Sequence, residues 1–93
     1  MADEAKYSLE VADQYRKVLK KLRRKNSVLV LAIEKVVGRI LRYPELGKPL
    51  RYSLRNYRRM HIEGSFVLLY EIRGSVVRLL DFDDHDRIYK KYS

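Results

Sequence analysis

The segment Tyr57–Phe82, YRRMHIEGSFVLLYEIRGSVVRLLDF, predicts three consecutive antiparallel strands joined by two tight turns. Gly74-Ser75 forms a two-residue loop with glycine first, the chemistry that a type II′ hairpin turn requires. This turn sets Glu71 directly opposite Arg78, where opposite charges on neighbouring strands attract each other. The predicted register therefore agrees with the charge pattern.

The second turn, Glu63–Ser65, is predicted to be a three-residue hairpin loop that contains glycine. It sets His61 opposite Val67 and Arg59 opposite Leu69. A slip of one residue would move every side chain to the other face of the sheet, so these two turns determine which side chains share a surface.

Successive side chains of a strand point to opposite faces, so the three strands sort into two surfaces. One is almost wholly apolar and needs a cover of helices: Met60, Ile62, Phe66, Leu68, Tyr70, Ile72, Val77 and Leu79. The other is mixed: Arg59, His61, Val67, Leu69, Leu80 and Phe82, with Glu71, Arg73 and Arg78 toward the Gly74 turn. Because water does not readily accept a large apolar patch, we expect the chain's own tail or a segment of another protein to cover its apolar members.

The global composition limits the possible classes of protein. The chain has 93 residues, of which 46% are hydrophobic, so we expect one domain over residues 1–93. It has no cysteine, which excludes disulfides and thiolate metal sites. No apolar run approaches the ~20 residues of a membrane span, and no signal peptide is evident, so we expect a cytoplasmic protein with no membrane association. The net charge of +9 favours a polyanionic partner such as RNA, DNA or an acidic protein.

The residues before the hairpins predict further elements. Lys6–Val11 alternates as a strand, and Asp13–Lys25 and Val28–Tyr43 carry apolar residues at helical spacing. Gly38 within the second helix indicates close packing against the first. Leu50–Arg55 alternates between apolar and polar residues and predicts another strand. The fold class is therefore α+β, in the order β-α-α-β-β-β-β, with an antiparallel meander and a two-helix hairpin packed on one face.

The first predicted helix is densely basic on the side away from its apolar stripe. This pattern fits a solvated helix face whose cations favour the helix C-terminus, and it equally fits a surface that follows phosphates. The candidate RNA-binding residues of the chain are Arg16, Lys17, Lys20, Lys21, Arg23, Arg24, Arg58, Arg78 and Arg87.

Several motifs in a fixed order give the chain a family resemblance. They are the basic first helix, GKPLRY, LRNYRRMHI, FVLLYEI and the ending LLDFDDHDRIYKKY. Together they resemble the RelE/ParE superfamily of toxins from type II toxin–antitoxin systems, closest to its archaeal RelE-like branch, over nearly the whole chain.

The resemblance implies an activity and partners. RelE-like toxins are endoribonucleases that cut mRNA in the ribosomal A site without a metal or other cofactor, and ParE-like relatives instead poison DNA gyrase. Both are held inactive by an antitoxin. For this chain the resemblance implies a RelB-like antitoxin, a toxin–antitoxin hetero-oligomer, and the ribosome and mRNA as targets. A RelE-fold protein without activity is a further alternative, because Val67 stands where many RelE-like toxins carry an arginine.

RNA cleavage by an adjacent 2′-hydroxyl needs a base, a cation at the phosphate and an acid for the leaving oxygen. We assign phosphate stabilisation to Arg59 and acid or base catalysis to His61. The resemblance adds His85 and Tyr89, for acid–base work or for stacking on a base. Ordinary structural roles stay open for each: an exposed histidine, a salt-bridge arginine and a packing tyrosine.

The acidic run around His85 also allows a metal-binding interpretation, since carboxylates and imidazole are common metal ligands. Its members are Asp81, Asp83, Asp84, His85 and Asp86. Their spacing fits no standard metal-binding loop, so we assign no metal site.

Overall fold

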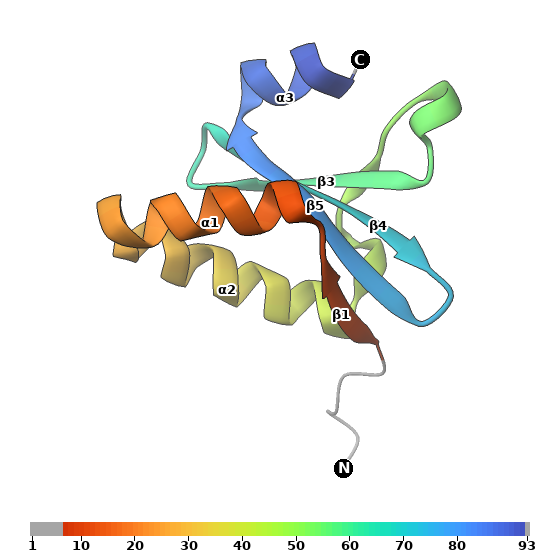
Figure 1. Cartoon of the computed structure of the whole chain (residues 1–93). Coiled ribbons are helices and arrows are strands. Elements are labelled where there is room, and N and C mark those ends of the chain that lie inside the picture. The colour runs from red at the N-terminus through yellow and green to blue at the C-terminus, as the bar shows by residue number, and fades with distance from the viewer. Residues whose placement is uncertain (1–6, 93) are drawn as a thin grey trace.

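The computed structural model describes residues 7–92, which form a five-stranded sheet with helices on both faces (Figure 1). The elements are β1 (Ser8–Val11), α1 (Asp13–Lys25), α2 (Ser27–Arg42), the 3-10 helix η1 (Pro44–Leu46), β2 (Lys48–Pro49), the 3-10 helix η2 (Tyr52–Leu54), β3 (Tyr57–Ile62), β4 (Phe66–Arg73), β5 (Val76–Asp84) and α3 (His85–Tyr92). The predicted α+β class is confirmed. Lys6, the first residue of the predicted first strand, lies outside the described residues.

The strand order is β1-β5-β4-β3-β2. β1 runs parallel to β5, and the other neighbouring strands are antiparallel. The sheet has both parallel and antiparallel pairs because α1 and α2 follow β1 in the sequence and carry the chain across the sheet before the antiparallel meander begins. No helix within residues 7–92 has the length and apolar character that crossing a membrane requires.

Both hairpins have the predicted register. Glu71 lies opposite Arg78, and His61 lies opposite Val67. The turn between β4 and β5 has its glycine, Gly74, at a φ of 56°, in the left-handed region where a side chain would be strained.

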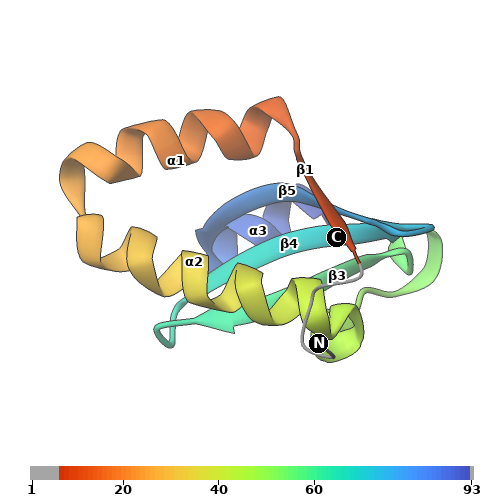
Figure 2. The same cartoon turned by 90° about the horizontal axis from the view of Figure 1, so that it is seen from below.

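α1 and α2 form the predicted hairpin over one face of the sheet (Figure 2). α1 has the predicted bounds, and α2 begins and ends one residue earlier than predicted. The Asn26 side chain accepts a hydrogen bond from the backbone of Leu29 and so caps the start of α2. The buried residues of this core are Tyr15, Leu19, Leu29, Val30, Ile33, Ile40, Ile62, Leu68, Tyr70, Val77, Leu79 and Phe82.

A β-bulge in β5 changes the face to which its last residues point. Leu80 is an extra residue between the pair that includes Tyr70 and the pair of Leu69 with Asp81. Alternation therefore shifts by one residue beyond the bulge. Phe82 joins the core beneath α1 and α2, so its predicted place on the mixed face is wrong. Asp81 takes the opposite face.

The predicted strand Leu50–Arg55 is also wrong. The short strand β2 lies just before it, and Tyr52–Leu54 forms the turn η2 instead. The alternation of this segment does not reflect burial, because Tyr52 is 83% exposed. The preceding loop is fixed to the sheet by the Tyr70 hydroxyl, which accepts a hydrogen bond from the Gly47 amide at 2.9 Å.

α3 is an element that the sequence did not predict. The side chain of Asp84 accepts a hydrogen bond from the Arg87 amide at 3.0 Å and thus caps its first turn. The helix packs on β4 and β5 and buries Ile88. Val67 and Leu69 on this face of β4 are fully buried. Of the two expected covers, the chain's own tail and a segment of another protein, the structure shows the tail, in the form of α3.

The carboxylate of Asp81 anchors the end of α3. It is fully buried and accepts hydrogen bonds from the Phe82 amide at 2.8 Å, the Lys91 ammonium at 3.1 Å and the Tyr92 hydroxyl at 2.9 Å. A buried carboxylate needs such partners, since an uncompensated charge in the protein interior is strongly destabilising.

Two glycines provide a matched test of packing. A Cβ at Gly47 would lie 2.7 Å from the Tyr70 hydroxyl and 2.8 Å from the Arg59 carbonyl oxygen, whereas a Cβ at Gly38 would meet no atom within 4 Å. The predicted close packing at Gly38 is therefore wrong. We expect Gly47→Ala to lower the free energy of unfolding by about 1–3 kcal/mol, and Gly38→Ala to raise it by about 0.5–1 kcal/mol. Urea denaturation measures both, and equal midpoints would contradict the prediction.

A second pair of variants tests the anchor of α3. Lys91→Ala removes one partner of the buried Asp81 and should lower the free energy of unfolding by about 1–2 kcal/mol. The effect is limited to this size because the ammonium group is partly exposed to water. Relative to the wild type, backbone amide hydrogen exchange should accelerate more in α3 than in the central strands. Lys90→Ala changes an exposed neighbour in the same helix and serves as the control. Identical exchange in the two variants would show that the Asp81 contact does not hold the helix.

Candidate active site

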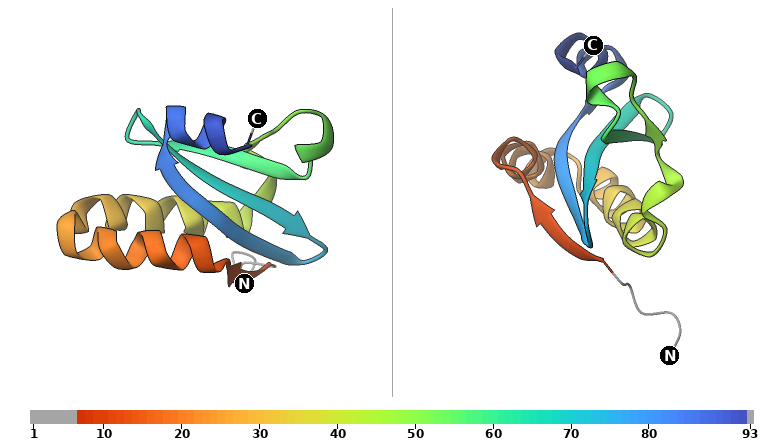
Figure 3. Two further views of the ribbon diagram at one scale, coloured as in Figure 1. Left: turned by 45° about the horizontal axis from the view of Figure 1, so that its top comes forward. Right: turned by 90° about the vertical axis from the view of Figure 1, so that its right-hand side faces the viewer.

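β3 presents Arg59 and His61 on the face turned away from α1 and α2, as the alternation of side chains predicts. The residues that flank them, Met60 and Ile62, point into the core on the other side. His61 is exposed, and Arg59 is partly buried. Figure 3 shows α3 on this side of the sheet, where it packs on β4 and β5. The alternation of β3 therefore places both predicted residues on the side that α3 covers.

α3 contributes the other two predicted residues, His85 and Tyr89. They are four residues apart and so lie on the same side of the helix. The backbone amide of His85 donates a hydrogen bond to the Ser65 carbonyl at 2.8 Å, which ties the start of α3 to the turn between β3 and β4. This contact brings His85 beside the end of β3.

The four side chains form one continuous cluster. The rings of His61 and His85 stack with their centroids 5.6 Å apart and their planes 22° apart. The ring of Tyr89 meets His85 edge-on at 4.3 Å. The guanidinium carbon of Arg59 lies 5.6 Å from the centre of the Tyr89 ring, within the range of a cation–π contact. Two imidazoles and one guanidinium therefore share a single surface.

The guanidinium group of Arg59 has a hydrogen-bond donor that no other described residue uses. Its Nε atom is buried and has no hydrogen-bond partner among residues 7–92. Buried polar groups nearly always have a partner, so an unpaired one needs an explanation, and a catalytic role is one such explanation. A guanidinium offers several donors in a planar fork, the geometry that suits phosphate oxygens.

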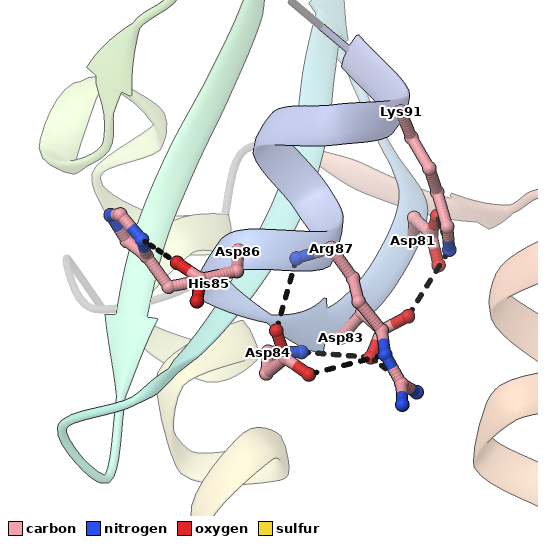
Figure 4. Close-up of polar contacts among 7 residues, drawn as sticks. All are labelled: Asp81, Asp83, Asp84, His85, Asp86, Arg87 and Lys91. Atoms are coloured by element: carbon pink, nitrogen blue, oxygen red, sulfur yellow. Dashed lines mark hydrogen bonds and ion pairs between the residues drawn. The ribbon is translucent and has the colours of Figure 1, made fainter.

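The neighbouring acidic residues have structural partners (Figure 4). Asp83 accepts a hydrogen bond from Lys91 at 3.2 Å and forms a longer ion pair with Arg87. His85 lies on the other side of the first turn of α3, 3.5 Å from a carboxylate oxygen of Asp86. Within residues 7–92, no group of three or more histidine and acidic side chains is placed to hold a metal ion.

The Asp81 anchor also affects two ionisable groups. Burial lowers the pKa of Lys91, but the hydrogen bonds and charges of Asp81 and Asp83 outweigh it and raise the pKa overall. Burial, followed by the hydrogen bond and charge of Asp81, raises the pKa of the Tyr92 hydroxyl well above its usual value. Both groups therefore stay protonated at neutral pH, the form in which they donate to Asp81.

The other predicted RNA-binding residues do not gather at this cluster. Arg58 donates to the backbone carbonyl of Gly47 at 2.7 Å and so holds the loop before β2. Arg78 forms ion pairs with Glu71 and Glu10 near the far end of the sheet. Arg87 pairs with Asp83 and Asp84. The α1 residues are all exposed, but α1 covers the opposite face of the sheet: Arg16, Lys17, Lys20, Lys21, Arg23 and Arg24.

A groove beside the cluster was missed at the sequence level. It has a volume of about 690 Å³, and Arg51 and Tyr52 line it together with Arg59, Tyr89 and Tyr92. The available signal was the segment RYSLRNY, in which cations alternate with tyrosines. The same segment also alternates between apolar and polar residues, which predicts a strand and conceals this signal.

Val67 forms an apolar floor next to the cluster. It pairs with His61 across β3 and β4 and is fully buried beneath α3. In this chain Val67 therefore contributes packing at the position where the family resemblance led us to expect an arginine.

Comparison with known proteins identifies the family. Residues 6–89 match the model of the ParE toxin of type II toxin–antitoxin systems, parDE. The RelE4 protein of Methanocaldococcus jannaschii, a candidate toxin by its name, is 37% identical over 87 residues, which cover 91% of this chain and 93% of that protein.

Solved structures agree with this assignment. The toxin–antitoxin complex RelBE2 from Mycobacterium tuberculosis contains a chain that is 29% identical, with a TM-score of 0.69, covering 89% of this chain and 97% of that one. The YoeB/ParE toxin from Agrobacterium tumefaciens has a TM-score of 0.77 at 17% identity, covering 84% and 98% of the two chains, and shows the shared fold. This chain belongs to the RelE/ParE superfamily of toxins from type II toxin–antitoxin systems.

Proposed function

We propose that this toxin is an endoribonuclease that cuts mRNA on the ribosome and thereby stops translation in the cytoplasm. The observation that supports the proposal is the convergence of Arg59, His61, His85 and Tyr89 from two distant segments on one surface. A gyrase-binding surface would have no need for two stacked imidazoles beside a guanidinium.

The proposed reaction is an internal transfer at one phosphate of the RNA. A base removes the proton of the 2′-hydroxyl, whose oxygen forms a bond to the adjacent phosphorus. The bond from phosphorus to the 5′-oxygen of the next nucleotide breaks, and an acid gives that oxygen a proton. The products are a 2′,3′-cyclic phosphate and a free 5′-hydroxyl, so atoms and charges balance without a metal or other cofactor.

The cluster contains a side chain for each step. His61 and His85 are the acid–base pair, since both rings border the same space. Arg59 stabilises the charge that develops on the phosphate oxygens. Tyr89 contacts both Arg59 and His85, so it positions these groups and offers an aromatic face to a base.

The basic face of α1 serves a different contact in this proposal. It lies across the sheet from the cluster, so it cannot touch the phosphate that Arg59 binds. Ribosomal RNA offers a dense array of phosphates, and exposed lysines and arginines bind such arrays without regard to sequence. We assign α1 to this docking role.

The proposed neutralising partner is a RelB-like antitoxin, with which the toxin forms a hetero-oligomer. The matched solved structures include toxin–antitoxin complexes from Escherichia coli and Mycobacterium tuberculosis. The charge of +9 on this chain favours an acidic or amphipathic antitoxin segment.

A ParE-like gyrase inhibitor is the second candidate, favoured by the family model that matches residues 6–89. One experiment separates the two. Purified toxin is added to a cell-free translation system, with primer extension on the mRNA, and in parallel to a gyrase supercoiling assay. Cuts at A-site codons support the endoribonuclease. Intact mRNA with inhibited supercoiling supports the ParE alternative, and neither effect supports a toxin that has lost its activity.

Substitution of the two β3 residues tests the assigned roles. We expect Arg59→Ala to reduce the rate of mRNA cutting by about 10²–10³-fold, the usual effect of removing one transition-state donor. His61→Ala should reduce it by about 10²–10⁴-fold. Arg39→Ala alters an exposed arginine on α2 and should leave the rate unchanged. Wild-type cutting by both β3 variants, with folding verified by circular dichroism, would remove these residues from the mechanism.

The pH dependence of cutting tests the histidine pair separately. Two residues that act as acid and base give a bell-shaped profile, so His85→Ala should abolish one limb of the profile as well as lowering the maximum rate. A merely structural role for His85 would lower the rate and leave both limbs in place. Lys90→Ala, on the exposed side of the same helix, should keep the complete profile.

A further inference from the structure

The groove between η2 and α3 is large enough for part of a flexible ligand. Its volume of about 690 Å³ lies within the range of small-molecule sites. Tyr52 lines it from η2, Tyr92 lines it from the end of α3, and Arg59 and Tyr89 belong both to the groove and to the catalytic cluster. The two elements lie beside each other at the same edge of the molecule (Figure 3).

Tyr52 is held in an unusual way. Its φ of 58° is in the left-handed region, which residues with bulky side chains rarely adopt. Hydrogen bonds from the Leu54 and Arg55 amides to the Arg51 and Tyr52 carbonyls, both 3.1 Å, close the turn and fix this backbone. Tyr52 is nevertheless 83% exposed, so packing of its ring does not explain the conformation. Unfavourable backbone geometry that presents a free side chain points to a function for that side chain.

The opposite wall of the groove is preorganised. The Tyr92 ring meets Tyr57 edge-on with centroids 6.4 Å apart, and its hydroxyl is bound to Asp81. Arg51 and Arg59 add positive charge, and no carboxylate lines the groove within the described part of the chain. Aromatic faces beside cations are the combination that binds unpaired nucleotides, because the bases stack and the phosphates are attracted.

The groove continues directly from the catalytic cluster. His85, at the start of α3, stacks on His61 near one end of β3, and Tyr92, at the other end of α3, contacts Tyr57 at the other end of β3. Arg59 lies between these ends. A nucleotide whose phosphate is bound by Arg59 therefore has its neighbour in the groove.

We propose that this groove is a base-binding subsite, in which Tyr52 stacks on the base of the nucleotide next to the cleaved phosphate. The inference rests on the proposed function, because it takes single-stranded RNA as the ligand. It adds Tyr52, Arg51 and Tyr92 to the substrate-binding residues, none of which was expected from the sequence. It also gives a function to a bulky residue at a position whose backbone conformation favours glycine or asparagine.

The first test measures binding of an RNA that cannot be cut. A six-nucleotide 2′-O-methyl RNA lacks the attacking hydroxyl, and its binding is followed by fluorescence anisotropy, free and as part of an mRNA on ribosomes. We expect Tyr52→Ala to weaken binding by about 5- to 150-fold, the effect of one lost base–aromatic stack. Tyr52→Phe keeps the ring and should bind like the wild type. Tyr43 is 65% exposed and lies outside the groove, so Tyr43→Ala should also have no effect on binding.

The second test observes the stack itself. The chain contains no tryptophan, so Tyr52→Trp introduces a single indole at this position. Its fluorescence should be quenched by the 2′-O-methyl RNA and much less by the same RNA with abasic residues. Tyr43→Trp provides the control indole, which should not respond to either RNA.

The outcomes separate this subsite from the proposed function. Wild-type binding by Tyr52→Ala, or equal quenching by abasic RNA, overturns the subsite even if the toxin cuts mRNA normally. Base-dependent quenching in a toxin that leaves mRNA intact supports the subsite and refutes the nuclease. Quenching by an acidic peptide and not by RNA, free or on ribosomes, overturns the subsite in favour of a protein ligand.

Discussion

The buried carboxylate of Asp81 is the interaction that assembles the candidate site. A charged group that is buried away from water needs hydrogen-bond partners or opposite charges nearby. Lys91 and Tyr92 of α3 are such partners for Asp81. Asp81 reaches that face only because the bulge at Leu80 shifts the alternation of β5. One extra residue in a strand thus determines where a helix docks, and the helix then carries His85 and Tyr89 to β3.

The cluster of Arg59, His61, His85 and Tyr89 has few strong internal bonds. Its members meet through ring stacking, an edge-on aromatic contact and a cation–π contact, each of which contributes modestly. Their arrangement therefore depends on the elements that carry them. The Asp81 anchor secures one end of α3, and the backbone bond between His85 and Ser65 secures the other. Two contacts outside the cluster thus keep the imidazoles and the guanidinium together.

Sequence reasoning succeeded where local chemistry has one geometric outcome. Glycine turns gave the register of β3 to β5, and alternation then placed Arg59 and His61 together. It failed at Leu80, because a bulge within apolar residues leaves no glycine or proline signal. It missed α3, whose charged sequence has little apolar surface apart from Ile88 and two tyrosines. It took the alternation around Tyr52 for a strand, and the groove there depends on contacts between distant segments that no local pattern reveals. His85 and Tyr89 were identified through family resemblance rather than through periodicity.

The order of elements along the chain has a consequence for synthesis. α3 follows every strand of the sheet, so a growing polypeptide completes β1 to β5 before His85 and Tyr89 can join Arg59 and His61. Until then Val67 and Leu69 lack the helix that buries them. A chain in which α3 has not yet docked therefore exposes an apolar surface on the face where the candidate site forms, and it lacks two of the four side chains of that site.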